Sequence, residues 1–207
     1  EYRLKPVNIA AGDQFKPEFL AISPNNRIPA IVDHDGPDGR PISLMESAAI
    51  LIYLAEKSGR FLPARGAARY EVLQWLTWQQ SGFGPTLGQM SHFNVYYKER
   101  LAYPIERFTR ETGRLYGVLD KQLANKEYMC GEYSLADMAT WPWIVPRKHH
   151  CIDIKDYPNI DRWNETMKHR PKLRKGFALL RDVLKQLSMN AQAKKDLYGT
   201  SEVDVGS

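Results

Sequence analysis

Two short stretches of the chain carry residue types suited to binding a small peptide. The first is Ile28-Pro29, followed by a short apolar run, and X-Pro bonds are the only peptide bonds with ready access to the cis form. A cis proline at the start of a strand can leave the backbone of the preceding residue open to an extended peptide. The second, Glu46-Ser47, begins a predicted helix, whose free N–H groups and partial positive charge hold a carboxylate. Together they predict a dock for a small peptide with a free carboxylate.

A mixed pattern of strands and helices surrounds these stretches. Alternating apolar residues predict strands, and apolar residues at helical spacing predict helices, with Gly59 ending the last of them. The predicted elements are a strand over 2–9, a short helix over 16–22, strands over 30–33 and 42–45 joined by a hairpin connection, and a helix over 46–58.

Beyond a linker at 59–66, apolar residues recur only at helical spacing. The switch predicts a domain boundary, with an α/β domain at 1–58, an all-α domain at 67–190 and a flexible tail at 191–207. Ser134 stands three residues before Asp137, the spacing of a helix-capping box, which we interpret as structural. The predicted helices lie at about 67–91, 101–124, 134–147, 158–169 and 172–187.

Composition limits the classes of function. The chain has 207 residues, of which 43% are hydrophobic and 26% charged, as in ordinary globular proteins. No apolar run is long enough to span a membrane, and the start does not resemble a signal peptide, so we expect a cytoplasmic protein without a membrane partner. The net charge of +5 comes without the Lys/Arg block typical of nucleic-acid binding, so no nucleic-acid partner is predicted.

The remaining chemistry-bearing side chains predict neither a metal site nor a redox pair. Cys130 and Cys151 lie far apart and form no CxxC motif, which favours packing or surface thiols over nucleophiles. His149-His150 lacks further ligands nearby, so no metal is predicted.

The two docking stretches resemble those of a known family. Ile28-Pro29 followed by Glu46-Ser47 is similar to the glutathione-binding half of the cytosolic glutathione transferases, and in particular to the bacterial nu-class group of glutathione-dependent disulfide-bond oxidoreductases. The resemblance implies a thioredoxin-like N-terminal domain joined to a helical C-terminal domain in a homodimer. It rests most specifically on the stretches 14–20, 23–32 and 82–89, in that order.

The resemblance also implies roles for individual residues. Ile28 would pair its backbone with the cysteinyl unit of glutathione, next to a structural Pro29. Glu46 and Ser47 would hold the γ-glutamyl end, and Gln14 would reach the glycine end. No metal or other cofactor is implied beyond glutathione itself, as co-substrate.

Two arginines and the second substrate complete the implied site. Arg27 lies beside the dock and is either a forked carboxylate donor or a solvated charge. Arg107 matches an arginine that reaches glutathione across the dimer interface, or else makes a surface ion pair. The Gly/Pro-rich stretch 81–89 either approaches a neighbouring helix closely or opens a cleft. Candidates for the electrophile side are Gln89, His92 and Phe93.

The start of the chain bears on the catalytic residue. A domain of the resembling family begins strand, helix, strand, whereas this sequence begins at what reads as the second strand. We therefore expect the first strand and helix to be missing, and with them a Thr-Pro-Asn-type turn whose residue activates the glutathione sulfur. No residue of this sequence is assigned that catalytic role.

Three functions are compatible with these features. The first is reduction of small disulfides by glutathione, with weaker conjugation or peroxide reduction. The second is a non-catalytic glutathione-binding stress or regulatory protein on the same fold. The third is conjugation of glutathione to a dedicated electrophile. Fold analogy alone does not separate them.

Overall fold

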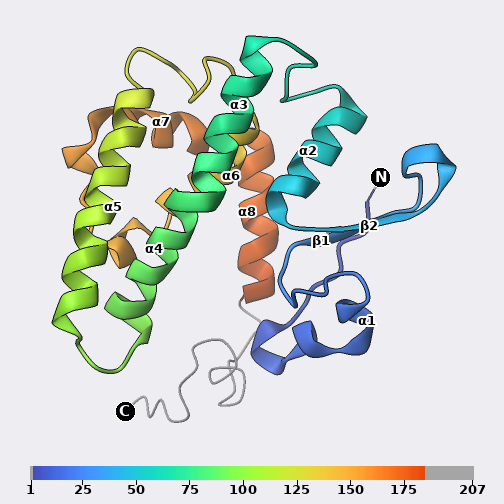
Figure 1. Cartoon of the computed structure of the whole chain (residues 1–207), viewed down its shortest axis with the longest axis horizontal. Coiled ribbons are helices and arrows are strands. Elements are labelled where there is room, and N and C mark those ends of the chain that lie inside the picture. The colour runs from blue at the N-terminus through green and yellow to red at the C-terminus, as the bar shows by residue number, and fades with distance from the viewer. Residues whose placement is uncertain (1, 185–207) are drawn as a thin grey trace. The chain divides into compact units, whose positions relative to one another are not determined.

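The computed structural model describes residues 2–184 of the chain (Figure 1). Within this part, residues 2–50 and 175–184 group into a first compact unit, and Leu51–Arg174 form a second. The predicted tail at 191–207 and the end of the helix predicted at 172–187 lie outside the described residues. The predicted linker at 59–66 and the domain limits stay predictions.

The first unit contains a two-stranded antiparallel sheet. Strand β1 (Ala30–Asp33) pairs with β2 (Ile42–Met45) in a register that sets Ala30 opposite Met45. The turn between them needs a left-handed backbone at Gly39, where φ is 68° and a side chain would be strained. The hairpin therefore forms where the sequence predicts it.

Helices flank the hairpin in the sequence. Helix α1 (Pro17–Leu20) begins with a proline, whose missing N–H costs nothing at a first helical position. Helix α2 (Ser47–Ser58) follows β2 directly and ends at Gly59, whose φ is 65°. Both helices agree with the sequence to within two residues at every end.

The prediction of a strand over residues 2–9 is wrong. Residues 2–8 have no regular structure, and Ile9–Ala11 form a single 3-10 turn capped by the Asn8 side chain. A strand needs a neighbour for its N–H and C=O groups. Within the described residues the sheet has only β1 and β2, which pair with each other.

The second unit is helical (Figure 1). Five-residue π-helical segments, Gln79–Phe83 and His92–Tyr96, precede and follow α4. Within residues 2–184 every helix is too short or too polar to cross a membrane. The helices that lie wholly or largely in this unit are α2, from Leu51 on, α3 (Ala67–Trp78), α4 (Gly84–Ser91), α5 (Ala102–Gln122), α6 (Leu135–Ile144) and α7 (Pro158–Lys168); α8 (Pro171–Leu184) begins in it.

The Gly/Pro-rich stretch of α4 serves close helix packing. A Cβ atom at Gly84 would lie 3.1 Å from the ring of Trp143 on α6, and one at Gly88 would lie 3.7 Å from it. Only glycine gives the tryptophan this room at Gly84. Of the two alternatives predicted for 81–89, the structure shows the close approach at Gly84 and Gly88, whereas Thr86 of the same stretch lines a hollow described below.

A buried carboxylate connects several elements of the second unit. Asp137 is fully buried and accepts hydrogen bonds from the backbone N–H of Met129 (3.0 Å) and from the indole N–H of Trp163 on α7 (2.9 Å). Ser134 donates from its N–H (3.0 Å) and its hydroxyl (3.2 Å), which completes the predicted capping box of α6. Burial raises the pKa of this carboxyl, whereas the four donors favour its charged form.

We expect Asp137→Ala to lower the free energy of unfolding of the whole chain by about 3 kcal/mol, because three residues would keep buried donors without an acceptor. Urea unfolding followed by circular dichroism measures the change. Glu132→Ala, an exposed acid in the same turn, is the control and should change the value by less than about 0.5 kcal/mol. Equal effects of the two substitutions would contradict the structural role of Asp137.

A buried histidine links two other elements of this unit. His150 is fully buried, and its Nδ1 lies 3.2 Å from the hydroxyl of Tyr116 on α5. The backbone C=O of the preceding His149 accepts a hydrogen bond from the Asn94 side chain at 3.1 Å. Burial, together with the neighbouring His149, lowers the pKa of His150 from 6.5 to about 4.

The lowered pKa predicts loss of stability in acid. Between pH 6.5 and 4 the unfolded chain takes up a proton on this ring and the folded chain does not, so folding is favoured above pH 6.5 and weakens below it. The loss should reach about 3 kcal/mol at pH 4. Unfolding of the wild type and of His150→Gln, compared from pH 7 to 4, measures it. The variant should lose less stability over this range; parallel curves would contradict the assignment.

Candidate functional site

The predicted peptide dock lies in the first unit. The Ile28–Pro29 bond is cis, and residue Ile28 is 52% exposed. The hydroxyl of Ser23 donates to the C=O of Arg27 at 2.8 Å, which closes the turn before the strand. Among the described residues, no backbone–backbone hydrogen bond is made by Ile28. Its N–H and C=O are therefore available to an extended peptide.

The backbone is strained just before α2, at Glu46, the residue expected to hold the γ-glutamyl end of glutathione. Glu46 is exposed and has a φ of 68°, a left-handed conformation that disfavours any residue with a Cβ. Its C=O still accepts the N–H of Ile50 at 3.0 Å, so the helix begins correctly behind it. A strained, exposed acid at a helix N-terminus is typical of a binding position.

The structure adds one residue that the sequence did not single out. The side-chain N–H of Asn25 donates to Oε1 of Glu46 at 3.3 Å. This bond connects the turn before β1 to the start of α2, which are 21 residues apart. The only sequence signal was the turn-forming pair Asn25-Asn26, which indicates a turn and not a contact with Glu46.

The two other predicted residues of this unit differ in exposure. Arg27 is exposed, and its side chain is open to solvent. Gln14 is 1% exposed, yet neither its amide N–H nor its amide oxygen has a partner among the described residues. A buried amide without partners costs about 1–3 kcal/mol. A polar ligand group that reached Gln14 would remove this cost.

The other predicted residues belong to the second unit. Gln89 is exposed on α4, and His92 and Phe93 lie in the π-helical segment that follows it. Their rings lie 5.0 Å apart edge to face, and Phe93 stacks on Phe108 of α5 at 5.6 Å. Of the three candidates, Phe93 thus contacts the same helix that carries Arg107.

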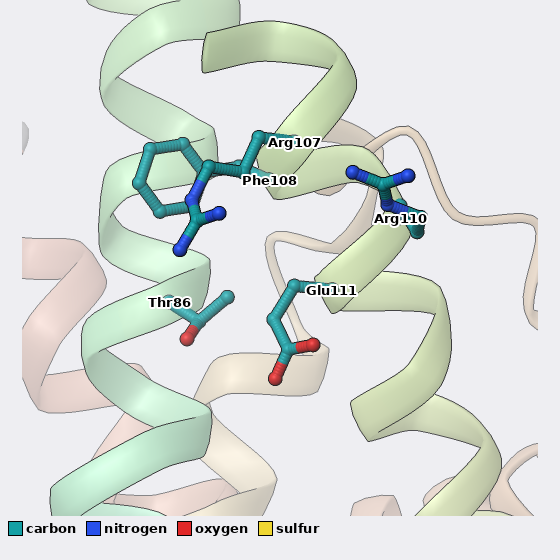
Figure 2. A pocket seen from close by; sticks show the side chains of 5 residues that line it. All are labelled: Thr86, Arg107, Phe108, Arg110 and Glu111. Carbon is teal, nitrogen blue, oxygen red and sulfur yellow. The ribbon is translucent and has the colours of Figure 1, made fainter.

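A hollow of about 310 Å³ lies between α4 and α5. Figure 2 shows the side chains of Arg107 and Thr86 projecting into the space between these helices, with the carboxylate of Glu111 beside them. We call it the α4–α5 hollow; it is lined by Thr86, Arg107, Phe108, Arg110 and Glu111.

Comparison with known proteins identifies the family. The family model described as "Glutathione S-transferase, N-terminal domain" matches residues 1–57. The chain is 51% identical over 183 residues to the disulfide-bond oxidoreductase YfcG of Escherichia coli, covering 87% of this chain and 84% of YfcG. The chain belongs to the glutathione transferase family.

Other relatives of this transferase agree with the assignment. The E. coli disulfide-bond oxidoreductase YghU is 42% identical over 185 residues, which is 85% of this chain and 63% of YghU. A solved glutathione transferase family member from Pseudomonas fluorescens with two glutathione bound has a TM-score of 0.81 and 42% identity, covering 85% of this chain and 81% of that one. A Pseudomonas putida glutathione transferase with one glutathione disulfide per subunit has the same TM-score and 39% identity, covering 85% and 80%.

These structures give the fold class of the transferase: a thioredoxin-like N-terminal domain followed by a helical C-terminal domain, as the sequence predicts. Both cysteines are free. Burial raises the pKa of Cys130 to about 12, so its thiol stays protonated and unreactive at neutral pH. In the described part of the chain, no three His, Cys, Asp or Glu residues group as a metal site would require.

Proposed function

We propose that this enzyme reduces small disulfides with glutathione, as a glutathione-dependent disulfide-bond oxidoreductase of the transferase family. The observation that carries the proposal is the pairing of two docks in one unit. The free backbone of Ile28 suits the cysteinyl part of glutathione. The strained Glu46 at the start of α2 suits the γ-glutamyl end, and Asn25 holds it beside the turn. Relatives at 39–51% identity are disulfide-bond oxidoreductases or bind glutathione disulfide.

The chemistry is thiol–disulfide exchange. A glutathione thiolate attacks one sulfur of the substrate disulfide, forms a mixed disulfide and releases one substrate thiol. A second glutathione attacks the mixed disulfide, which releases the second substrate thiol and leaves glutathione disulfide. In this proposal, residues of this chain bind and orient the tripeptide. None of them is assigned the role of activating its sulfur.

Several finer features belong to the same proposal. Gln14 would contact the glycine end of glutathione, Arg27 one of its carboxylates, and Ser47 its γ-glutamyl end. Gln89, His92 and Phe93 would face the second substrate. Arg107 would reach the glutathione of a second subunit in a homodimer. A cytoplasmic location suits the two free cysteines, because thiols stay reduced there.

The first test is the rate at which the protein reduces a small dialkyl disulfide with glutathione, coupled to glutathione reductase. We expect a rate well above uncatalysed exchange, which would support the oxidoreductase function. Bound glutathione without turnover would instead favour the non-catalytic binding protein. Turnover of a halogenated aromatic in place of disulfides would favour a dedicated conjugating enzyme.

The strain at Glu46 gives a sharper test of the dock. Glu46→Gly removes the carboxylate and relieves the left-handed strain, so we expect glutathione to bind about tenfold more weakly while stability is unchanged or rises by up to about 1 kcal/mol. Calorimetric titration and thermal unfolding measure the two effects.

The matched control is Asp38→Gly. Asp38 also has a positive φ, of 58°, and lies in the hairpin turn rather than at the dock. It should show the same relief of strain without any loss of glutathione affinity. Equal affinities of the two variants for glutathione would contradict the role of Glu46.

A further inference from the structure

The segment His92–Tyr96, which carries two of the electrophile-side candidates, is wound as a π-helix. Its turn is closed by the backbone N–H of Tyr97, which donates to the C=O of His92 at 2.8 Å. This winding is rare in proteins, and single π-helical turns are frequent at functional sites. Contacts from outside the segment are therefore expected to stabilise its shape.

Asn94, in the middle of this segment, makes such a contact. Its side-chain N–H donates to the backbone C=O of His149 at 3.1 Å, across 55 positions of the sequence. The rings of Tyr96 and His149 also pack edge to face, with their centroids 6.2 Å apart. The hydrogen bond is partly buried, so water competes with it less than at the open surface. Two contacts thus join the π-helical segment to the turn Arg147–His150.

The acceptor of this hydrogen bond lies in a firmly held turn. The next residue, His150, is fully buried, and its Nδ1 lies 3.2 Å from the hydroxyl of Tyr116 on α5. The turn closes through the backbone N–H of Ile152, which donates to the C=O of Arg147 at 3.2 Å. Asn94 therefore connects a partly exposed segment to a turn that a buried side chain fixes in the second unit.

The two aromatic rings that precede Asn94 are fixed from another side. The Phe93 ring stacks on Phe108 of α5 at 5.6 Å, and the His92 ring lies edge-on to the Phe93 ring at 5.0 Å. Both His92 and Phe93 stay partly exposed. Because α5 holds Phe93 and the turn at His149 holds Asn94, the pair of rings is kept in one orientation. Such preorganisation is what a surface that selects a substrate requires.

We propose that Asn94 is a positioning residue for the second substrate, which it serves by fixing the orientation of the His92 and Phe93 rings. The inference rests on the proposed function, because it places the second substrate at these rings. Asn94 acts through the rings and does not touch the reacting sulfur atoms. The proposed dock at Ile28 and Glu46 belongs to the first unit, so loss of the Asn94 contact should leave the affinity for glutathione unchanged.

The test is Asn94→Asp, which keeps the shape of the side chain and replaces its donor by an acceptor facing the C=O of His149. Reduction of hydroxyethyl disulfide is followed in the assay coupled to glutathione reductase, with both substrates varied at neutral pH. We expect the KM for the disulfide to rise about fivefold, while kcat and the KM for glutathione stay within about twofold. A partly unfolded variant would instead lose apparent kcat without a rise in one KM alone.

The matched control is His149→Ala, which removes the imidazole and keeps the backbone C=O that Asn94 binds. Its KM for the disulfide should stay within about twofold of the wild-type value. Asn94→Ala, which only removes the donor, replaces Asn94→Asp should that variant fail to fold, with an expected rise of about threefold.

Two results would overturn the inference and leave the proposed function intact. One is an unchanged KM for the disulfide in the Asn94 variants, and the other is an equal rise in His149→Ala. Absence of disulfide reduction by the wild type would overturn the proposed function, and the inference with it.

Discussion

Burial of one carboxyl side chain constrains the whole second unit. Asp137 has no contact with solvent, so every oxygen lone pair that faces the core needs a donor. The donors come from the loop at Met129, from the cap of α6 and from Trp163 on α7. The three elements can pack only in the arrangement that satisfies the carboxylate. This arrangement fixes α6, whose Trp143 in turn requires glycine on α4.

A similar constraint determines where α7 begins. Asp120 on α5 accepts the backbone N–H groups of Asn159 (2.9 Å) and Ile160 (3.1 Å) in the first turn of α7. Those N–H groups have no partner within their own helix. The long helix α5 therefore holds α7 through Asp120 on one side and presents Arg107 and Glu111 to the α4–α5 hollow elsewhere along its length. Residues that hold α7 and residues that line the hollow thus lie on the same helix.

In the first unit, two residues of the proposed dock are in energetically unfavourable states. A left-handed backbone at Glu46 and a buried amide without partners at Gln14 are both unfavourable in the free protein. Neither feature improves packing, and both involve residues that the family resemblance assigns to glutathione. The lower stability of the free protein at these positions is explained if a bound polar ligand supplies the missing interactions.

The sequence by itself determined most of the elements and the family. Helical periodicity, Gly59 and the Ser134–Asp137 spacing are local signals, because caps and amphipathic faces depend on residues within one or two turns. The prediction of a strand over 2–9 was wrong because a strand needs a neighbouring strand to pair with, and a local sequence pattern does not indicate one. Only the tertiary structure decided that Asn25 meets Glu46 and that Thr86, Arg107 and Glu111 surround one hollow. Contacts between residues more than 20 positions apart depend on how helices and turns pack, and the sequence carries no periodic signal for them.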